Sequence, residues 1–530
     1  MPKPATQNII VCLTQFSINV PSTINLNGFF GDIHNDSRAI GEGDIFCAII
    51  GHHQDGRQYI EQAILQGAKL VLAECEDITE HGDVAFASSD NKIAIVKCYE
   101  LSQHLFTLTK NYYQAPQDNM TLVGITGTNG KTTTSQLLAQ MLSAYDKPCA
   151  VIGTNGAGPL DNLQPIENTT PGACELHHLF NRFNDEKFSS VAMEVSSHAL
   201  SQKRVQADLF DIAVFTNLSR DHLDYHGSMA SYGEAKKQIF TTGGNQIAVV
   251  NFDDEQAQKW LENWPEQQTL WLYSRENNIT SHKQFVMAED IKHLSHGVSF
   301  TLASHLGNID ITSPLLGDFN IDNLLAAISV LLIQGVPLSE LPNLVIQVNA
   351  IAGRMEATSA KHLATAVVDY AHTPDALEKA LKACRQHCAG ELYVVFGCGG
   401  DRDKGKRPLM AQAAEKYADY LIVTNDNPRS EDAKLIANDI VAGFSNPDAE
   451  KITIILEREQ AVLKTLTKAK LGDIVLLAGK GHEDYVIVAK HDEQGVIIGT
   501  QKLAYNERLV VKDFYQKHTD LATLSNEANL

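Results

Sequence analysis

The sequence predicts an α/β protein built from three domains, and its length, composition and periodicity all point to that class. At 530 residues the chain is too long for a single hydrophobic core. Hydrophobic residues make up 44% and charged residues 20%, the balance of a globular protein. Short apolar runs alternate with helical stretches, which indicates mostly parallel sheets covered on both faces. We expect a small α/β domain over residues 1–100, a central mostly parallel domain over 101–351 and a Rossmann-like, doubly wound domain over 352–530.

The elements of the first domain are short. Apolar runs at 44–50, 69–73 and 93–96 predict strands that are separated by polar turns. Residues 101–113 predict a helix, and the sequence Gln-Ala-Pro-Gln-Asp that follows it is a break. This break predicts the connection to the central domain.

The central and third domains repeat one alternation of strand and helix. In the central domain we predict a helix at 132–142 and strands at 122–126, 190–195, 212–216 and 246–251. Residues 277–310 are more polar and typical of a hairpin. After Arg354 the alternation resumes, with helices at 374–387 and 407–417 and strands at 364–369, 391–397, 419–424, 451–456 and 473–478.

Charge and cysteine content exclude several classes of partner. Lys and Arg number 43 against 64 Asp and Glu, and the net charge of −21 repels nucleic-acid backbones. No apolar run approaches the roughly 20 residues of a membrane span, and polar residues interrupt the N-terminal stretch where a signal peptide would be apolar. Nine scattered cysteines without a C-x-x-C pair favour reduced thiols. We expect a cytoplasmic protein with neither a nucleic-acid nor a membrane partner.

A glycine-rich turn between the strand at 122–126 and the following helix has the composition of a phosphate loop. Its glycines let backbone N–H groups converge, the helix N-terminus adds partial positive charge, and Lys131 can reach the β- and γ-phosphates. A hydroxyl of Thr132 or Thr133 is placed to ligate Mg²⁺. The usual spacing would put a glycine at Ile125, and here it falls at Gly127, so the loop is a variant. It predicts ATP binding through Gly127, Thr128, Asn129, Gly130, Lys131, Thr132 and Thr133.

Two further segments place polar side chains at the ends of predicted buried strands. Glu194 ends the strand at 190–195, and a second group follows the strand at 212–216, consisting of Asn217, Asp221, His222, Asp224 and His226. Ligands bind at the carboxyl ends of parallel strands. Mg²⁺ bridging phosphate oxygens requires oxygen ligands. Together with the loop, these segments predict a metal–nucleotide site.

Ten motifs occur in an order that resembles the Mur ligase family, over about Asp36 to Tyr485. They are TGTNGKTTT, ENTTPG, AMEVSSHAL, FTNLSRDHLDYHG, GDFNIDN, GRME, VVDYAHTP, FGCGGDRDKGKRP, DNPR and AGKGHEDY. The resemblance implies an ATP-dependent ligase of bacterial peptidoglycan synthesis. It implies that UDP-N-acetylmuramoyl-L-Ala-D-Glu is activated as an acyl phosphate and joined to meso-2,6-diaminopimelate. It also implies that the first domain binds uridine and the third binds the amino acid.

The resemblance also assigns residues by motif. The catalytic set is Lys131, Glu194, His222 and Lys236, with Mg²⁺ held by Thr132, Glu194, His222 and a carbamylated Lys236. Nucleotide contacts beyond the loop are Asn251, Asn320, Asn323 and Arg354. The UDP-linked peptide is bound by Ser37, His52, His53, Gln54, Asn168, Thr169, Thr170, Ser196, Gln202 and Arg204. The amino acid is bound by Arg402, Asp426, Asn427, Pro428, Arg429, Gly479 and Glu483.

Three alternatives to this reaction stay open on the sequence. Arg429 can clamp the distal carboxylate that diaminopimelate has and lysine lacks, which favours diaminopimelate over the lysine-adding branch of the family. A folylpolyglutamate synthase shares the type of loop, but neither DNPR nor a uridine-binding domain is expected in it. A nucleotide switch would need no third domain for an amino acid. We expect a monomer.

Overall fold

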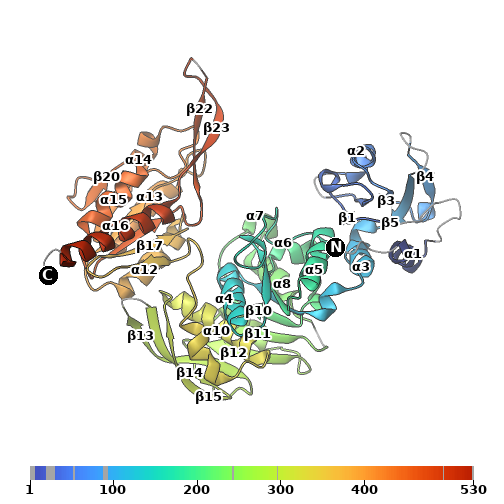
Figure 1. The fold of residues 1–530 in the computed structure, drawn as a ribbon, viewed down its shortest axis with the longest axis horizontal. Helices are drawn as coiled ribbons and strands as arrows, with labels where there is room; N and C mark the ends of the chain where they lie inside the picture. Colours follow the sequence, from blue (N-terminus) through green and yellow to red (C-terminus); the bar gives the residue numbers. More distant parts are fainter. Residues whose placement is uncertain are drawn as a thin grey trace. The chain divides into compact units, whose positions relative to one another are not determined.

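The computed structural model describes residues 6–18, 30–51, 54–87, 93–241, 244–294, 297–492 and 494–527. They form two compact units (Figure 1). The first unit contains the described residues within Met1–Tyr273, together with His282–Gln284 and Ser329–Gln334. The second contains Ser274–Ser281 and the described residues within Phe285–Ile328 and Gly335–Leu530. None of the helices in these ranges combines the length and the apolar composition that crossing a bilayer requires.

The first unit begins with a small five-stranded sheet in the order β1-β2-β3-β5-β4. All neighbours are parallel except β4, which is antiparallel to β5. Every residue of β2 and β3 is buried, as expected of strands covered on both faces. The elements are α1 (Thr6–Gln15), β1 (Ile33–His34), β2 (Ile45–Ala48), α2 (Ile60–Leu65), β3 (Leu70–Cys75), β4 (Val84–Phe86), β5 (Ala94–Tyr99) and α3 (Leu101–Tyr112).

A larger sheet of the same unit has strands in the order β12-β11-β10-β6-β9-β7-β8, parallel except for β8. The chain leaves β6 on one side towards β9 and β7 and returns on the other side as β10. The strands are β6 (Thr121–Thr126), β7 (Cys149–Gly153), β8 (Gly156–Gly158), β9 (Ser190–Glu194), β10 (Ile212–Phe215), β11 (Ile247–Asn251) and β12 (Thr269–Ser274). The helices are α4 (Lys131–Ala144), α5 (Ala173–Asp185), α6 (Ser197–Ser201), α7 (Leu223–His226), α8 (Met229–Lys237) and α9 (Glu255–Leu261).

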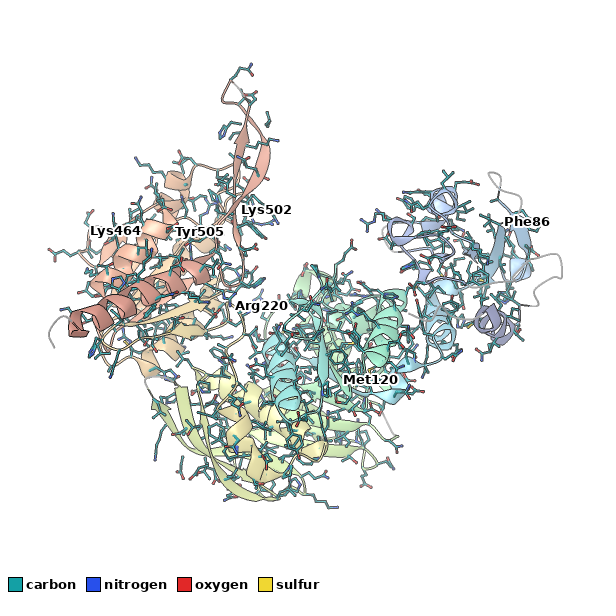
Figure 2. The ribbon with its side chains drawn as sticks, in the orientation of Figure 1. Phe86, Met120, Arg220, Lys464, Lys502 and Tyr505 are labelled. Carbon is teal, nitrogen blue, oxygen red and sulfur yellow. The ribbon has the colours of Figure 1, made fainter. Side chains whose placement is uncertain are left out.

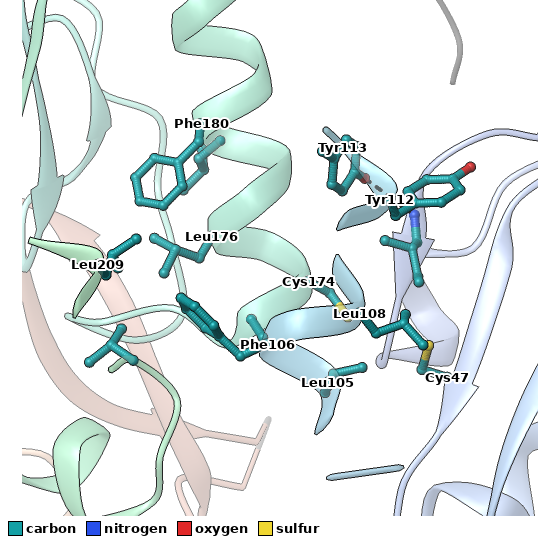
Figure 3. Packing of buried hydrophobic residues seen from close by; sticks show 14 of the residues in the cluster. Cys47, Leu105, Phe106, Leu108, Tyr112, Tyr113, Cys174, Leu176, Phe180 and Leu209 are labelled. Carbon is teal, nitrogen blue, oxygen red and sulfur yellow. Dashed lines mark hydrogen bonds between the residues drawn. The ribbon is translucent and has the colours of Figure 1, made fainter. Parts of the chain in front are cut away.

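Helix α3 joins the two sheets of this unit through one hydrophobic core. Figure 3 shows Phe106 on the side of Leu176 and Leu209, and Leu108 on the side of Cys47. All of these side chains are at least nine-tenths buried. The core is therefore continuous between the small sheet and the larger one.

The second unit opens with an antiparallel meander and continues into a six-stranded sheet. The meander is β13 (Phe285–Leu294), β14 (Gly297–Ser304) and β15 (Gly307–Ser313). It is followed by α10 (Asp318–Ile333), of which the residues from Ser329 onward belong to the first unit, and by α11 (Leu341–Val345). The sheet has the order β16-β17-β21-β18-β19-β20, parallel except for β16. Its strands are β16 (Glu356–Thr358), β17 (Thr365–Asp369), β18 (Leu392–Phe396), β19 (Tyr420–Val423), β20 (Ile452–Ile454) and β21 (Ile474–Ala478).

Helices cover both faces of this sheet. Successive residues of a strand point to opposite faces, so neighbouring side chains pack against different helices. Leu476 packs in the cluster that includes α12 (Pro374–His387), α13 (Lys406–Tyr417) and α14 (Ala433–Val441). Its neighbour Leu477 packs in the opposite cluster, against α15 (Arg458–Lys468) and α16 (Glu507–Glu527). This is the doubly wound arrangement that the sequence predicts.

A two-stranded antiparallel hairpin completes the second unit and projects from the six-stranded sheet (Figure 1). It consists of β22 (Tyr485–His491) and β23 (Ile497–Ala504). Every residue of β23 is exposed. Lys502, labelled in Figure 2, places its ammonium 3.8 Å from the centre of the Tyr485 ring. The sequence analysis did not predict this hairpin.

The secondary structure confirms the predicted strand–helix alternation. The helix predicted at 374–387 is α12, which begins where the Thr373 hydroxyl accepts a hydrogen bond from Ala376 N and Pro374 takes the first helical position. The predicted strands all occur, within about three residues of the predicted ends. The polar stretch predicted as a hairpin is the antiparallel meander. The domain boundaries at 100 and 351 stay predictions.

The buried ion pair between Arg458 and Glu507 gives a prediction about stability. The Arg458 guanidinium donates to both Glu507 oxygens at 2.7 and 2.9 Å, and both side chains are buried. Glu507→Gln keeps the side-chain shape but leaves a buried guanidinium without its counter-charge, which costs about 3–5 kcal/mol. We expect amide hydrogen exchange in α15 and β21 to accelerate accordingly.

The matched control is Lys379→Gln. Lys379 pairs with Asp375 at 2.8 Å on the exposed face of α12, where such pairs contribute little. We expect its exchange pattern to equal that of the unmodified chain. Equal exchange rates in Glu507→Gln and Lys379→Gln would contradict the assignment of stability to the buried pair.

Candidate functional site

The phosphate-loop sequence forms the turn between β6 and α4, as predicted. Gly127 and Gly130 have φ of 153° and 87°, in the region that favours glycine. A Cβ at Gly127 would lie 1.9 Å from the Thr216 hydroxyl, so this position also excludes a side chain sterically. Helix α4 starts at Lys131, and its N-terminus therefore faces the loop.

Residues after β10 hold this loop from the neighbouring strand. Asn129 N donates to Asn217 Oδ1 at 2.9 Å, and the Thr216 hydroxyl donates to Asn129 O at 2.6 Å. The pairing of Phe215 with Thr126 brings the two strand ends together. Asn217, which the sequence placed near the metal–nucleotide site, thus shapes the loop backbone.

Two lysines converge on the same carbonyl group of the loop. Lys131 Nζ donates to Gly127 O at 2.8 Å and to Thr128 O at 2.9 Å. Lys236 Nζ also donates to Gly127 O at 2.8 Å. Lys236 comes from α8, which the Ser228 hydroxyl caps by accepting from Ser231 N.

Lys236 lies in surroundings that disfavour its charged form. Its side chain is buried, with 1% of the residue exposed. Burial, followed by the neighbouring charge of Lys131, lowers the pKa of Lys236 to about 6, while Asp221 acts in the opposite direction. At neutral pH this lysine is therefore largely an uncharged amine, which is nucleophilic.

Glu194 lies beside the loop because β9 pairs with β6, with Ile125 opposite Glu194. The carboxylate is buried and accepts hydrogen bonds from the Thr132 hydroxyl at 2.9 Å and from Thr154 N at 2.9 Å. The Thr154 hydroxyl adds a third at 3.2 Å. A carboxylate and a hydroxyl in contact beside a phosphate loop form an oxygen donor set that fits Mg²⁺.

A cavity of about 500 Å³ opens between these elements of the first unit. Nine of the predicted residues line it, namely Lys131, Asn168, Thr169, Thr170, Ser196, Gln202, Arg204, His222 and Lys236. Four more lining residues were not predicted from the sequence, namely Thr154, Ser197, His198 and Tyr232. His198 and Ser197 lie within the quoted motif AMEVSSHAL, so the motif could have indicated them.

Arg204 brings a largely buried positive charge into this cavity. One Nη donates to Thr170 O, and burial lowers the pKa of the guanidinium. Among the described residues, no carboxylate lies within 4.0 Å of it. A guanidinium in this setting is suited to a carboxylate of a bound molecule.

His222 belongs to a small cluster of aromatic rings that includes His198 and His226. It precedes α7 with φ of 51°, and its Nε2 lies 3.5 Å from Asp221 Oδ2. The ring of His198 lies 4.9 Å from that of His222 and 5.4 Å from that of His226. Burial, followed by neighbouring positive charge, lowers the pKa of both His198 and His226.

Carboxylate, imidazole and thiol groups alone form no metal site in the described ranges, where no three of them are arranged to hold an ion. A cation beside Glu194 would therefore need other oxygen ligands. The Thr132 hydroxyl is one. Phosphate oxygens or a carboxylated lysine would supply the rest.

The remaining predicted nucleotide residues use their side chains locally. In the first unit, Asn251 Nδ2 donates to Thr216 O at 2.8 Å. In the second, Asn320 Nδ2 donates to Leu316 O at 2.9 Å and Asn323 Nδ2 to Asn320 Oδ1 at 3.2 Å. The Arg354 guanidinium lies 4.9 Å from the centre of the Tyr370 ring. Their assignment to a nucleotide stays a prediction.

Of the predicted uridine-binding residues, Ser37 and Gln54 are described, and neither lines the cavity. Ser37 is buried, and its hydroxyl lies 3.5 Å from Gln62 Oε1. Gln54 is exposed, and its carbonyl accepts from Gly51 N at 2.9 Å. His52 and His53 lie outside the described residues.

The predicted amino-acid residues gather in the second unit, at the carboxyl ends of its parallel strands. Arg429 follows β19 with φ of 52°, an uncommon conformation for a side chain of this size. Its Nη1 donates to Gly400 O at 2.8 Å, and its backbone N to Ile487 O at 3.0 Å. A Cβ at Gly399 would lie 2.7 Å from Arg429 Nη1, and a Cβ at Gly400 would lie 1.9 Å from Pro428 O. The glycines after β18 therefore leave room for the DNPR turn.

The buried Asp426 and Asn427 of that turn form a polar cluster with the half-buried Glu483. Asn427 Nδ2 donates to Glu483 Oε2 at 3.0 Å. Lys480, which the sequence analysis missed, contacts all three residues. Gly479 has φ of 115°, and Arg402 is exposed. The structure thus brings the two motifs DNPR and AGKGHEDY together.

Models of known protein families match most of the chain. Mur ligase family, catalytic domain, matches residues 32–107, and Mur ligase middle domain matches 125–331. Mur ligase, glutamate ligase domain, matches residues 353–481.

Individual relatives are similar over nearly the whole chain. A UDP-N-acetylmuramoyl-L-alanyl-D-glutamate–2,6-diaminopimelate ligase of Haemophilus influenzae is 44% identical over 486 residues, which cover 91% of this chain and 96% of the relative. A solved structure of a ligase with that name is 33% identical, with a TM-score of 0.70, over 96% of this chain and 99% of the other. The MurF ligase of Thermotoga maritima in complex with ADP has a TM-score of 0.59 at 19% identity, over 87% and 96%.

Gly153 gives a prediction about the Glu194 carboxylate. A Cβ at Gly153 would lie 2.1 Å from Glu194 Oε1, and its backbone does not itself require glycine. Gly153→Ala should push the carboxylate away from the Thr132 hydroxyl. We expect the affinity for MgADP, measured by titration calorimetry, to fall at least about tenfold, or about 1.4 kcal/mol.

Gly172→Ala is the matched control, since nothing lies within 4 Å of a Cβ at that position. It should leave the affinity for MgADP unchanged. Equal affinities in both variants would mean that the position of Glu194 does not matter for nucleotide binding.

Proposed function

The chain belongs to the Mur ligase family, and on that premise we propose that it joins UDP-N-acetylmuramoyl-L-Ala-D-Glu to meso-2,6-diaminopimelate with hydrolysis of ATP to ADP. The family matches and the 44% identity to a diaminopimelate-adding relative support this reaction. Such a reaction belongs to bacterial peptidoglycan synthesis in the cytoplasm.

One observation carries the proposal for the mechanism. The same cavity is lined by Lys131 of the phosphate loop and by Arg204. ATP is thereby bound next to a guanidinium that is suited to a substrate carboxylate. A nucleotide switch would have no use for the second group.

The chemistry requires these two groups because a carboxylate is a poor electrophile. A carboxylate oxygen of the D-Glu residue attacks the γ-phosphorus of ATP, the bond from phosphorus to the bridging oxygen breaks, and ADP leaves. The amine of diaminopimelate then attacks the acyl carbon of the acyl phosphate and loses a proton. Phosphate departs from the tetrahedral intermediate, and the amide remains. The protein contributes positioning and charge neutralisation.

The residues around the loop suit the ATP end of this reaction. Lys131 and the N–H groups of residues 127–133 would bind the phosphates. Thr132, Glu194, His222 and a carbamylated Lys236 would hold Mg²⁺, which neutralises phosphate charge when bound. Asn251, Asn320, Asn323 and Arg354 are assigned to the nucleotide by motif.

Carbamylation of Lys236 has support in its surroundings. CO₂ reacts with an uncharged amine to form a carbamate and a proton, and burial makes this lysine largely uncharged at neutral pH. The product is an anionic oxygen ligand in place of a cation. It would join the carboxylate of Glu194 beside the loop.

The substrates' other ends fit the remaining assignments. Ser37 and Gln54 are assigned to the uridine, and Asn168, Thr169, Thr170, Ser196 and Gln202 to the muramoyl peptide. Arg429 would bind the distal carboxylate of diaminopimelate, with Glu483 suited to an ammonium group. Arg402, Asp426, Asn427, Pro428 and Gly479 complete this set.

The alternative reactions have less support. Folylpolyglutamate synthases share the fold at 18% identity, with a TM-score of 0.54, and this similarity extends over 71% of the chain. A lysine-adding ligase would not need Arg429, because lysine has no distal carboxylate. The monomeric state stays a prediction.

Phosphate release tests the reaction directly. We expect phosphate to appear only when ATP, the UDP-linked dipeptide and diaminopimelate are all present, and lysine to substitute poorly. In Arg429→Ala, the preference for diaminopimelate over lysine should fall at least about thirtyfold, equivalent to about 2 kcal/mol for a lost charged contact. Lys379→Ala, on the exposed face of α12, should retain the preference.

Two outcomes would contradict these assignments. Equal rates with lysine and diaminopimelate in the unmodified enzyme would remove the specificity assigned to Arg429. Phosphate release from ATP alone, unaffected by the other substrates, would favour a nucleotide switch.

Carbamylation gives a separate prediction. Lys236→Ala should abolish turnover, and short carboxylic acids such as acetate or propionate should restore part of it by replacing the missing anionic ligand. Lys237→Ala is the matched control, because Lys237 is the adjacent, less buried lysine. It should stay fully active and show no response to the acids.

The pH dependence follows from the lowered pKa of Lys236. Above pH about 6 the amine is uncharged and can take up CO₂, and below it the ammonium form prevents carbamate formation. We expect ¹³C NMR with labelled bicarbonate to show a carbamate signal that weakens as pH falls through about 6. A signal that persists in Lys236→Ala would assign the carbamate elsewhere.

A further inference from the structure

Lys480 is a fully buried lysine at the carboxyl end of β21. Its exposed fraction is 0%, which is rare for a charged side chain without compensating partners. It belongs to none of the contacts that the family motifs assign. Its partners nevertheless include three residues of the amino-acid site.

The three protons of the Lys480 ammonium are all used. Nζ donates to Asn427 Oδ1 at 2.7 Å, to Glu483 Oε2 at 3.2 Å and to Tyr485 O at 3.1 Å. It also lies 3.1 Å from Asp426 Oδ1 as an ion pair without hydrogen-bond alignment. The ammonium of Lys480 therefore contacts three places: the DNPR turn, Glu483 in its own motif AGKGHEDY, and the first residue of β22.

These contacts determine how the Asn427 amide is oriented. Its oxygen accepts from Lys480 Nζ and from Ile487 N at 2.9 Å, and its nitrogen donates to Glu483 Oε2. Exchanging the oxygen and nitrogen would place donors against donors and a carbonyl against a carboxylate. The second oxygen, Glu483 Oε1, accepts no hydrogen bond from the described residues, so it is available to a ligand.

We propose that Lys480 is the positioning residue of the amino-acid site, which fixes Asn427 and Glu483 and reduces the charge of the cluster. Asp426, Glu483 and Lys480 together carry one net negative charge. That charge suits one ammonium group of a diamino acid, while Arg429 remains for its carboxylate. Without Lys480, two uncompensated carboxylates would face each other beside the ligand. The proposal rests on the proposed function, because it takes diaminopimelate as the ligand of this site.

A second buried cation nearby shows what a purely structural role looks like. Arg458 donates to both oxygens of Glu507 and to the backbone carbonyls of Asn425 and Ala478. Among the described residues, its guanidinium makes no hydrogen bond or ion pair with a side chain of the amino-acid site, and Asp426 acts on it only through longer-range charge. Lys480, in contrast, directs two of its three hydrogen bonds to such side chains.

Lys480→Met tests the proposal because methionine keeps much of the volume without charge or donors. We expect the KM for diaminopimelate in the phosphate-release assay to rise about 10- to 100-fold. The KM for ATP and the KM for the UDP-linked dipeptide should stay within about twofold. Arg458→Met is the control, in which thermal stability falls but the KM for diaminopimelate stays within about threefold of the unmodified value.

A second variant keeps the test decisive if Lys480→Met does not fold. The double variant Lys480→Met, Asp426→Asn also removes the Asp426 carboxylate, which would otherwise be buried without a cation, and should restore folding. Asn427 and Glu483 still lack their hydrogen bonds from Lys480. Its KM for diaminopimelate should exceed that of Asp426→Asn alone by at least about tenfold.

Several results would overturn the proposal. They are an unchanged KM for diaminopimelate in Lys480→Met, an equal rise in Arg458→Met, or equal KM values in the double variant and Asp426→Asn. Failure of the proposed function is distinguishable, because the unmodified enzyme would then not respond to diaminopimelate at all.

Discussion

The carbonyl oxygen of Gly127 accepts a hydrogen bond from each of two lysines, and the first site is organised around this convergence. Gly127 can present its carbonyl in this way only with a φ that favours glycine. The oxygen gives Lys131 and Lys236 a common partner, but it cannot neutralise either charge. Burial and the nearby Lys131 together keep Lys236 largely uncharged. The loop that is suited to phosphate thus also keeps this lysine in the uncharged form that the proposed carbamylation requires.

Parallel strand order explains why distant motifs meet. Because β9, β6 and β10 are neighbours, their carboxyl ends bring Glu194, the phosphate loop and Asn217 together. In the second unit, β21, β18 and β19 do the same for AGKGHEDY, FGCGG and DNPR. Each site therefore brings polar side chains from separate segments of the chain to the carboxyl edge of a parallel sheet. The chain thus uses one architectural rule twice, for the two sites that we assign to nucleotide and amino acid.

The sequence predicted what depends on local periodicity and on quoted motifs. Strands such as 122–126 and the helix at 374–387 follow from apolar spacing and from a Thr-Pro start. Lys480 was missed because its importance arises where DNPR and Glu483 meet, and neither segment shows that meeting alone. The orientation of Asn251 was equally inaccessible, since its partner Thr216 directly follows the neighbouring strand β10. Hairpin β22–β23 was missed, and its exposed second strand packs too little for burial to leave a pattern.

Asn129 and Asn427 differ in their susceptibility to deamidation. An asparagine deamidates when the backbone nitrogen of the next residue attacks its side-chain carbonyl. Gly130, favoured by its φ of 87°, follows the exposed Asn129 and has no side chain that would obstruct the attack. Pro428 follows Asn427, and its ring nitrogen carries no hydrogen and cannot form the cyclic imide. The turn that contains Asn427 is therefore closed to this reaction, whereas the glycine at position 130 leaves Asn129 the more susceptible of the two.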